Sequence, residues 1–199
     1  MRLFTAIELG DTARARAAAL LDTLRRRASE SAPHAKVTWV PAERMHLTLR
    51  FIGEVDEAKG EAILAALREP VRLGPFEVRW EGLGSFPPRG APRVLWVGVA
   101  TGRAGLVEAE AAVSERLQLL GIPREDRPYS PHLTLARVRE PAGLKAAPLF
   151  EGLDGALGET HVETITLFRS HVSPKGPTYV VLERTRLRDG RNAEAPRDE

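Results

Sequence analysis

Short apolar runs with the two-residue period of β-strands alternate along the chain with longer stretches whose apolar residues recur at helical spacing. The run that contains "HLTLRFIG" is closed by Gly53, and the run "FEVRWEGLGSF" ends in the turn "PPRGAP". Strands are predicted at residues 2–9, 36–40, 46–53, 76–86, 93–100, 132–138, 161–172 and 178–187.

Three long helices are predicted between these strands, at residues 11–30, 56–69 and 103–120. Asp11 or Thr12 is expected to cap the first helix, and Asp56 lies at the start of the second, which Pro70 follows. The third stops at Gly121. Residues 141–152 are expected to be irregular or weakly helical, and the polar tail 188–199 is expected to be disordered.

The order of these elements occurs twice. A strand, a long helix and a strand with the sequence His-Leu-Thr-Leu occupy residues 2–53, and the same succession occupies 93–138. A long strand, a turn rich in Pro and Gly, and a further strand follow each unit, in "SFPPRGAPRVLWV" and "HVSPKGPTYVVL". The halves interlock at 93–100. This internal repeat predicts two lobes packed together as one domain over 1–187.

The composition bounds the class of protein. Of 199 residues, 43% are apolar and 28% charged, and no apolar run is long enough for a transmembrane helix, so we expect a soluble, cytoplasmic protein. The absence of cysteine excludes a disulfide framework, a thiolate nucleophile and a Cys-ligated zinc. The net charge of +2 is too small for a nucleic-acid coat, although the many arginines suit local phosphate contacts.

The two His-Leu-Thr-Leu strands carry the candidate chemistry. Side chains alternate between the faces of a strand, so His46 and Thr48 share one face, as do His132 and Thr134, while the leucines point to the core. If the lobes are related by a pseudo-two-fold axis, the two polar faces meet across a cleft. Two imidazoles can then act as acid and base near neutral pH, and two hydroxyls can bind phosphoryl oxygens, without a metal or other cofactor.

Other catalytic motifs are absent from the sequence. It contains no His-x-x-x-His or His-Glu-x-x-His spacing for a metal, no Gly-x-x-x-x-Gly-Lys or Gly-x-Gly-x-x-Gly phosphate-binding loop, and no Gly-x-Ser-x-Gly elbow of a serine hydrolase. The paired His-x-Thr motifs are therefore the strongest functional signal in the chain.

With these motifs and their flanks the sequence resembles the 2H phosphoesterase superfamily. Within it, the chain is most similar to the bacterial and archaeal RNA 2',3'-cyclic phosphodiesterases, long called 2'-5' RNA ligases. The resemblance covers residues 1–187 and is carried by "MRLFTAIEL", "WVPAERMHLTLRFIGEV", "RPYSPHLTLARV" and "LFRSHVSPKGPTYVVLER".

The resemblance implies an α+β fold of two pseudo-symmetric lobes, each an antiparallel sheet with helices on its outer face, with the active site in the groove between them. It implies hydrolysis of a terminal 2',3'-cyclic phosphate on RNA to a 2'-phosphate. By this likeness His46 is the proton donor, His132 the proton acceptor, and Thr48 and Thr134 bind the phosphate. RNA is the expected partner, and a monomer without an obligate protein partner or a metal is our expectation.

Three further residues near the motifs are candidates for substrate contacts. Arg137 completes a His-x-Thr-x-x-Arg pattern of the family, but on a regular strand it would face away from His132 unless a β-bulge intervenes, whereas Arg50 would share the face of His46. Phe51 could stack on a base or pack in the core. Tyr129 could contact substrate or belong to the core or rim.

Two other classes of function stay open at this point. Within the superfamily, the groove could cleave or form 2'-5' linkages or open a small cyclic phosphate. The protein could also be a non-catalytic RNA-binding module, but a pure binder does not need a matched acid–base pair.

Overall fold

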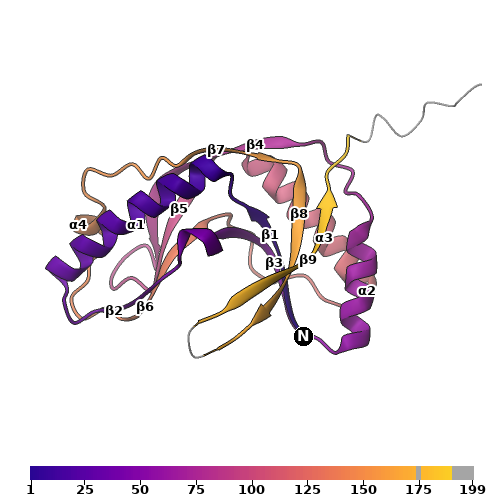
Figure 1. The fold of residues 1–199 in the computed structure, drawn as a ribbon, viewed down its shortest axis with the longest axis horizontal. Helices are drawn as coiled ribbons and strands as arrows, with labels where there is room; N and C mark the ends of the chain where they lie inside the picture. Colours follow the sequence, from indigo (N-terminus) through magenta and orange to yellow (C-terminus); the bar gives the residue numbers. More distant parts are fainter. Residues whose placement is uncertain (174–175, 190–199) are drawn as a thin grey trace, which may run out of the picture.

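Two antiparallel sheets form the framework of the protein in the computed structural model, which describes residues 1–173 and 176–189 (Figure 1). The first sheet has the strand order β3-β1-β8-β9 and the second β2-β6-β5-β4-β7. The strands are β1 (Arg2–Glu8), β2 (Lys36–Trp39), β3 (His46–Glu54), β4 (Phe76–Phe86), β5 (Val94–Thr101), β6 (Leu133–Glu140), β7 (Gly158–Val162), β8 (Thr164–His171) and β9 (Thr178–Arg186). The helices are α1 (Asp11–Ser31), η1, a 3-10 turn (Ala42–Arg44), α2 (Glu57–Arg68), α3 (Arg103–Leu119) and α4 (Ala146–Phe150).

The predicted α+β class and most predicted elements are confirmed, but the strand predicted at 161–172 is wrong. That stretch is the end of β7 and all of β8, which lie in different sheets. Val162 is buried in the second sheet and Ile165 in the first, so the chain crosses between the sheets at Glu163. The apolar pattern continues across this crossing because both sides of it are buried.

Helix starts were predicted with mixed success. Asp56 caps α2 as expected, since its side chain accepts a hydrogen bond from the backbone N–H of Lys59 at 2.7 Å. The N-cap of α1, however, is Gly10 and not Asp11 or Thr12. Asp11 is instead the first helical residue, where its negative charge favours the helix dipole. The predicted disordered tail lies almost entirely outside the described residues.

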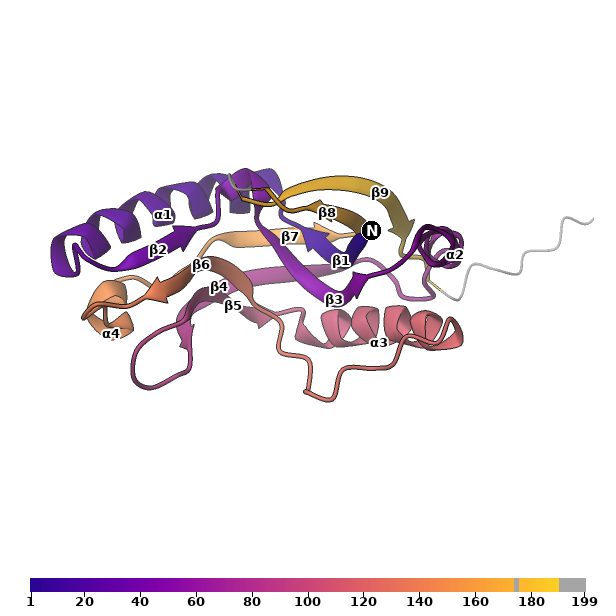
Figure 2. The same cartoon turned by 90° about the horizontal axis from the view of Figure 1, so that it is seen from below.

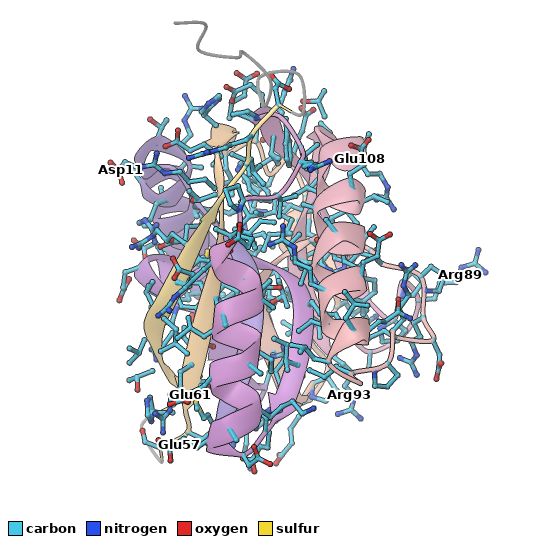
Figure 3. All side chains as sticks on the ribbon, turned by 90° about the vertical axis from the view of Figure 1, so that its right-hand side faces the viewer. Asp11, Glu57, Glu61, Arg89, Arg93 and Glu108 are labelled. Carbon is cyan, nitrogen blue, oxygen red and sulfur yellow. The ribbon has the colours of Figure 1, made fainter. Side chains whose placement is uncertain are left out.

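The repeated succession of elements is visible as β1-α1-β3 and β5-α3-β6, but each of the two helices packs against the sheet to which its own two strands do not belong. Helix α1 follows a strand of the first sheet but lies against β7 of the second and against α4. Helix α3 follows a strand of the second sheet but lies against β3 of the first, beside α2 (Figures 2 and 3). One continuous hydrophobic cluster therefore extends through both sheets.

The leucines of both His-Leu-Thr-Leu sequences point into this core, as predicted. Leu47, Leu49, Leu133 and Leu135 are at most 4% exposed. Their apolar burial, at about 1.5–3 kcal/mol per side chain, anchors both motif strands. The histidines and threonines lie half-buried on the opposite face of each strand. Among the described residues, no helix is both long and apolar enough to cross a membrane.

Thr160 links the two sheets where β7 passes the end of β1. Its buried hydroxyl accepts a hydrogen bond from the indole N–H of Trp80 at 2.7 Å and one from the backbone N–H of Gly10 at 3.2 Å. Trp80 is fully buried in the second sheet, whereas the half-buried Gly10 comes two residues after β1 of the first sheet. One hydroxyl thus accepts hydrogen bonds from both lobes.

Replacement of this hydroxyl should destabilise the whole protein. Thr160→Val keeps the size of the side chain but removes the acceptor of the buried indole N–H of Trp80 and of the half-buried N–H of Gly10, so we expect the free energy of unfolding to fall by about 2 kcal/mol. Urea denaturation measures the change, with Thr178→Val at an exposed strand position as the matched control. Equal stability of the two variants would contradict this role of Thr160.

Candidate active site

The first motif lies on the side of the first sheet that faces away from the main core. In the register of β1 and β3, Glu8 pairs with His46 and Ala6 with Thr48, so these four side chains share one face. On the same face a small separate apolar cluster forms from Phe4, Ala6 and Phe168, with Tyr179 of β9 packed against it. The imidazole of His46 therefore lies on an aromatic floor, beside a carboxylate on the next strand.

A β-bulge in β3 changes which residues share this face. Ala6 pairs with Thr48 but Thr5 pairs with Arg50, so Leu49 is an extra residue in β3. Leu49 and Arg50 are each only 4% exposed, whereas Phe51 is 45% exposed. The expectation that Arg50 shares the face of His46 is therefore wrong, because the bulge reverses the alternation and brings Phe51 there instead. The alternative that Phe51 packs in the core is wrong as well.

The second motif strand carries the same bulge at the equivalent place. Trp96 pairs with Thr134 but Leu95 pairs with Ala136, which makes Leu135 the extra residue in β6. Leu135 and Ala136 are both fully buried, and the exposed Arg137 follows on the side of Thr134. The bulge that Arg137 needs in order to share the face of His132 is thus present.

The side chain of Arg50 instead contacts the segment between α3 and the second motif. Its guanidinium is almost completely buried, donates to the backbone carbonyl of Pro123 and lies 3.1 Å from the carboxylate of Glu125. Nearby, the hydroxyl of Tyr129 donates to the backbone carbonyl of Thr48 at 3.2 Å. These contacts fasten the segment before His132 to the strand of the first motif.

Tyr129 therefore braces the two motif strands and lies outside the pocket that contains His46. Burial raises the pKa of its phenol far above the usual value, so the hydroxyl stays protonated and keeps donating. The structure places Tyr129 against the backbone of β3, which favours a rim or core role over a direct contact with substrate.

A pocket of about 660 Å³ opens above the face of the first motif. Its volume is in the range of small-molecule sites. It is lined by Arg2, Phe4, His46, Thr48 and Phe51 from the first sheet, by Arg137 and Arg139 of β6, and by Ser170, Val172, Pro177 and Tyr179 around the β8–β9 turn. His132 and Thr134 are outside this lining. Thr134 lies on β6 on the same side as Arg137, and His132 directly precedes this strand.

Both histidines are held in the same way by the backbone. The Nδ1 atom of His46 lies 2.9 Å from the carbonyl oxygen of Arg44, and that of His132 lies 2.7 Å from the carbonyl oxygen of Ser130. A carbonyl oxygen can only accept, so Nδ1 carries the hydrogen in each ring. In the neutral rings, Nε2 is then the free basic atom, with the lone pair that acid–base chemistry needs.

The aromatic surroundings of the two rings are also alike. The ring of Tyr179 stands edge-on to His46 at 5.1 Å between centroids, and that of Phe86 stands edge-on to His132 at the same separation. Phe4 packs on His46 at 4.8 Å and Trp96 lies 6.4 Å from His132. These contacts fix the plane of each imidazole and leave little freedom of rotation.

The comparisons with known proteins agree with this arrangement. A family model described as the 2'-5' RNA ligase superfamily matches residues 12–174, a range that includes both His-x-Thr motifs. The chain belongs to this superfamily. The resemblance to the 2H phosphoesterases predicted from the sequence is thereby confirmed.

Relatives in the superfamily are similar over nearly the whole chain. A protein of Thermus thermophilus named RNA 2',3'-cyclic phosphodiesterase is 39% identical over 94% of this chain and 91% of its own length. One of the same name from Archaeoglobus fulgidus is 35% identical over 90% and 96%.

Solved structures in the superfamily share the fold. A crystal structure of a Thermus thermophilus protein has a TM-score of 0.77 at 32% identity and covers 96% of this chain and 100% of that one. The E. coli protein LigT, solved in complex with 3'-AMP, has a TM-score of 0.69 at 26% identity and covers 94% of this chain and 97% of that one.

The two histidines of this superfamily member differ in their charged neighbours. Glu8 pairs with His46, whereas the register of β5 and β6 ends with Val97 opposite Leu133, and the next residue of β5 is Gly98, which has no side chain. Partial burial acts to raise the pKa of the Glu8 carboxyl, but hydrogen bonds from Arg184 at 3.0 Å and Thr166 at 2.7 Å outweigh it and hold that pKa low. Glu8 is therefore ionised at neutral pH.

Burial lowers the pKa of His46 below the usual histidine value. The hydrogen bond to Arg44 and the charge of Glu8 act in the opposite direction, and the guanidinium of Arg137 adds to the lowering. In the free protein His46 is accordingly held mainly as the neutral imidazole at pH 7. An anion bound beside it would raise its pKa and favour the protonated form.

Several residues of this site were missed at the level of sequence. Glu8 and Phe4 become part of it only through strand register, for which the sequence has no signal. Arg139 could have been found, because it follows Arg137 by two residues and so shares its face. Tyr179 gave no signal beyond its place after the turn that follows β8.

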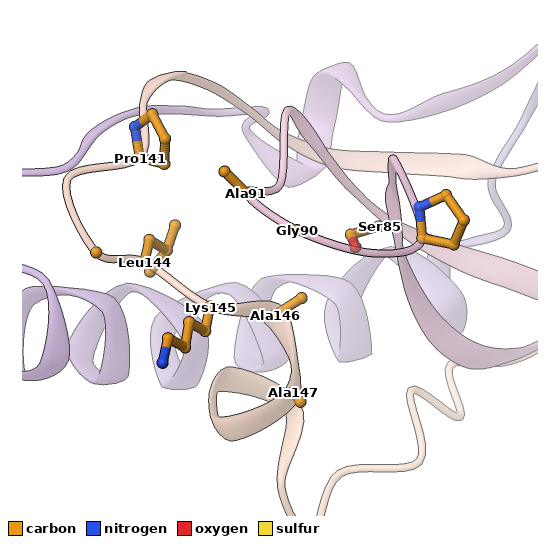
Figure 4. A pocket seen from close by; sticks show the side chains of 10 residues that line it. Ser85, Gly90, Ala91, Pro141, Leu144, Lys145, Ala146 and Ala147 are labelled. Carbon is orange, nitrogen blue, oxygen red and sulfur yellow. The ribbon is translucent and has the colours of Figure 1, made fainter.

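A second cavity of about 510 Å³ lies elsewhere, between the β4–β5 turn and the segment after β6 (Figure 4). Lys145 is the one charged residue in its lining, which is otherwise formed by Ser85, Pro88, Gly90, Ala91, Pro141, Gly143, Leu144, Ala146 and Ala147. No residue of either His-x-Thr motif contributes to this second cavity. We therefore assign the candidate site to the groove formed by the pocket of His46 and the adjacent second motif.

The electrostatic surroundings of His46 can be tested by NMR titration of its imidazole resonances. Glu8→Gln removes a negative charge, so the protonated ring loses stabilisation and the pKa of His46 should fall. Arg137→Gln removes a positive charge and should raise it. Glu57→Gln, the same change at an exposed position on α2, should leave it unchanged. A rise with Glu8→Gln would show that the carboxylate does not act on this ring.

Proposed function

We propose that the protein hydrolyses the 2',3'-cyclic phosphate at the end of an RNA to a 2'-phosphate, with His46 and His132 as acid and base. The chain is an enzyme of the RNA 2',3'-cyclic phosphodiesterase class, because relatives of that name are 30–39% identical to it over most of its length. The mechanism, the product and the roles of individual residues are the parts proposed here.

The observation that carries the mechanism is the matched pair of histidine hydrogen bonds. Each Nδ1–H is held by the carbonyl two residues upstream, so each ring offers Nε2 as its reactive atom. Two such groups on equivalent strands supply an acid and a base without help from a metal ion.

The reaction follows from these two groups. His132 accepts a proton from a water molecule as the water oxygen attacks phosphorus. The bond between phosphorus and the 3' oxygen breaks, and His46 donates its proton to that oxygen. The product carries a 2'-phosphate and a free 3'-hydroxyl. Thr48 and Thr134 donate hydrogen bonds to the non-bridging oxygens, where negative charge increases in the transition state.

Arg137 and Phe51 complete the proposed site. Arg137 shares the pocket with His46, and its fixed positive charge can neutralise the phosphate in the bound state. Phe51 lies on the same face with nearly half of its surface exposed, and the guanidinium carbon of Arg2 lies 5.1 Å from its ring centroid. An exposed aromatic ring beside a phosphate site can stack on an unpaired base.

Removal of either histidine should abolish most of the activity. For a short RNA that ends in a 2',3'-cyclic phosphate, assayed in excess chelator, we expect His46→Ala and His132→Ala each to lower kcat by about 100- to 10,000-fold. Chromatography against standards identifies the product as a 2'- or a 3'-phosphate.

The matched control is His161→Ala, since this histidine lies exposed on β7, 2.6 Å from Glu77, and is not part of the pocket. Full activity of either groove variant, or a 3'-phosphate product, would contradict the proposed mechanism. Bound RNA without turnover by the parent protein would instead favour the RNA-binding module.

The dependence of kcat/KM on pH separates the roles of the two histidines. A proton donor must be protonated, so kcat/KM should fall as the pH rises through the pKa of His46 in the free enzyme. Glu8→Gln lowers that pKa, and we therefore expect the alkaline limb of the profile to move to lower pH while the acid limb stays in place.

Arg184→Gln is the control, because it breaks the same Glu8–Arg184 contact but keeps the negative charge of Glu8. This variant should not move the alkaline limb to lower pH. If Glu8→Gln instead moves the acid limb, His46 is the base and the two roles are reversed.

A further inference from the structure

Three guanidinium groups line the pocket of His46, which is more positive charge than one cyclic phosphate requires. Arg137 and Arg139 reach it from β6, and Arg2 reaches it from β1 on the facing wall. The lining residues include no carboxylate. Within the described part of the chain, none of the three arginines forms a salt bridge. The pocket is therefore built for more than one negative charge.

The two arginines of β6 place this positive charge at two successive points along the strand. The bulge at Leu135 puts Arg137 on the side of the second motif. Arg139 is the extra residue of a second bulge, against β2, and its side chain lines the same pocket as that of Arg137. Two residues of a regular strand span about 7 Å. This step is close to the distance between successive phosphates along an extended nucleic acid strand.

The backbone of Arg139 is also held in place. Nη1 of Arg93, the residue directly before the neighbouring strand β5, donates to the carbonyl oxygen of Arg139 at 2.9 Å. A fixed strand position presents a guanidinium to phosphate at lower entropic cost than a mobile loop does. Arg139 is thus both exposed to the pocket and anchored at its main chain.

We propose that Arg139, together with Arg2, binds the phosphate that links the last two nucleotides of the RNA. The inference rests on the proposed function, which assigns the cyclic phosphate to the histidines, the threonines and Arg137. It adds that the enzyme recognises an oligonucleotide end and prefers it to a nucleoside 2',3'-cyclic monophosphate.

The test compares three substrates that react at the same group. These are adenosine 2',3'-cyclic monophosphate, the dinucleotide ApA with a 2',3'-cyclic phosphate, and the same dinucleotide with a neutral methylphosphonate in its internal linkage. We expect kcat/KM to be about 10- to 100-fold higher for the charged dinucleotide than for the mononucleotide, as one to two charged hydrogen bonds allow. The methylphosphonate should lose most of this gain, although it keeps the second base.

The variant Arg139→Gln should reduce the ratio of kcat/KM between dinucleotide and mononucleotide, and should reduce the loss of kcat/KM that the methylphosphonate causes, because only Arg2 then remains to bind the internal phosphate. Arg89→Gln is the matched control. It makes the same change in charge on a side chain that extends from the β4–β5 turn into solvent, outside the pocket (Figure 3). The control should keep the ratio of the parent protein.

Each outcome separates this inference from the proposed function. Turnover of all three substrates at equal efficiency, or an equal loss of the ratio in both variants, would overturn the subsite while leaving the activity intact. If the parent protein turns over none of them, the affinities of the dinucleotides with open 2'-phosphate ends decide the question. A charged linkage that binds no tighter than the methylphosphonate would overturn the subsite as well.

Discussion

The extra residue in each motif strand is the constraint on which the candidate site depends. Without the bulge at Leu49 the buried guanidinium of Arg50 would point into the groove, and without the bulge at Leu135 the side chain of Arg137 would point into the core. Each bulge reverses the alternation of side chains along its strand. The leucines of both motifs therefore point into the core, while Phe51 on β3 and Arg137 on β6 point into the groove.

Equivalent backbones thus support a site whose two halves differ. The carbonyl oxygens of Arg44 and Ser130 orient their histidines in the same way, but only His46 has a carboxylate across the strand. Glu8 favours the charged form of that ring, against the effects of burial and of Arg137. The proposed acid and base need different environments, and the presence of Glu8 beside His46 is one such difference.

Much of the fold and part of the site could be predicted from the sequence. Period-two alternation located the strands and assigned the leucines of both motifs correctly, because these strands have one buried face. Alternation failed at Arg50 and Phe51, since a bulge depends on how neighbouring strands pair and leaves no mark in the local pattern. It failed again at Glu163, where the chain passes from one sheet to the other, because the apolar residues before and after this point are both buried. Glu8 was missed for a related reason, because only register places it opposite His46.

The exchange of α1 and α3 between the sheets has a mechanical consequence. Helix α1 lies against the second sheet and α3 against the first, although each follows a strand of the other sheet, and one hydrophobic cluster includes residues of both, so the two lobes share a core. The two walls of the groove are therefore not hinged bodies that could open independently, and separating them would expose the apolar faces of both sheets to water. Because the core is shared, we expect folding of the chain and assembly of the groove to be one cooperative event, which a half-length fragment could not complete.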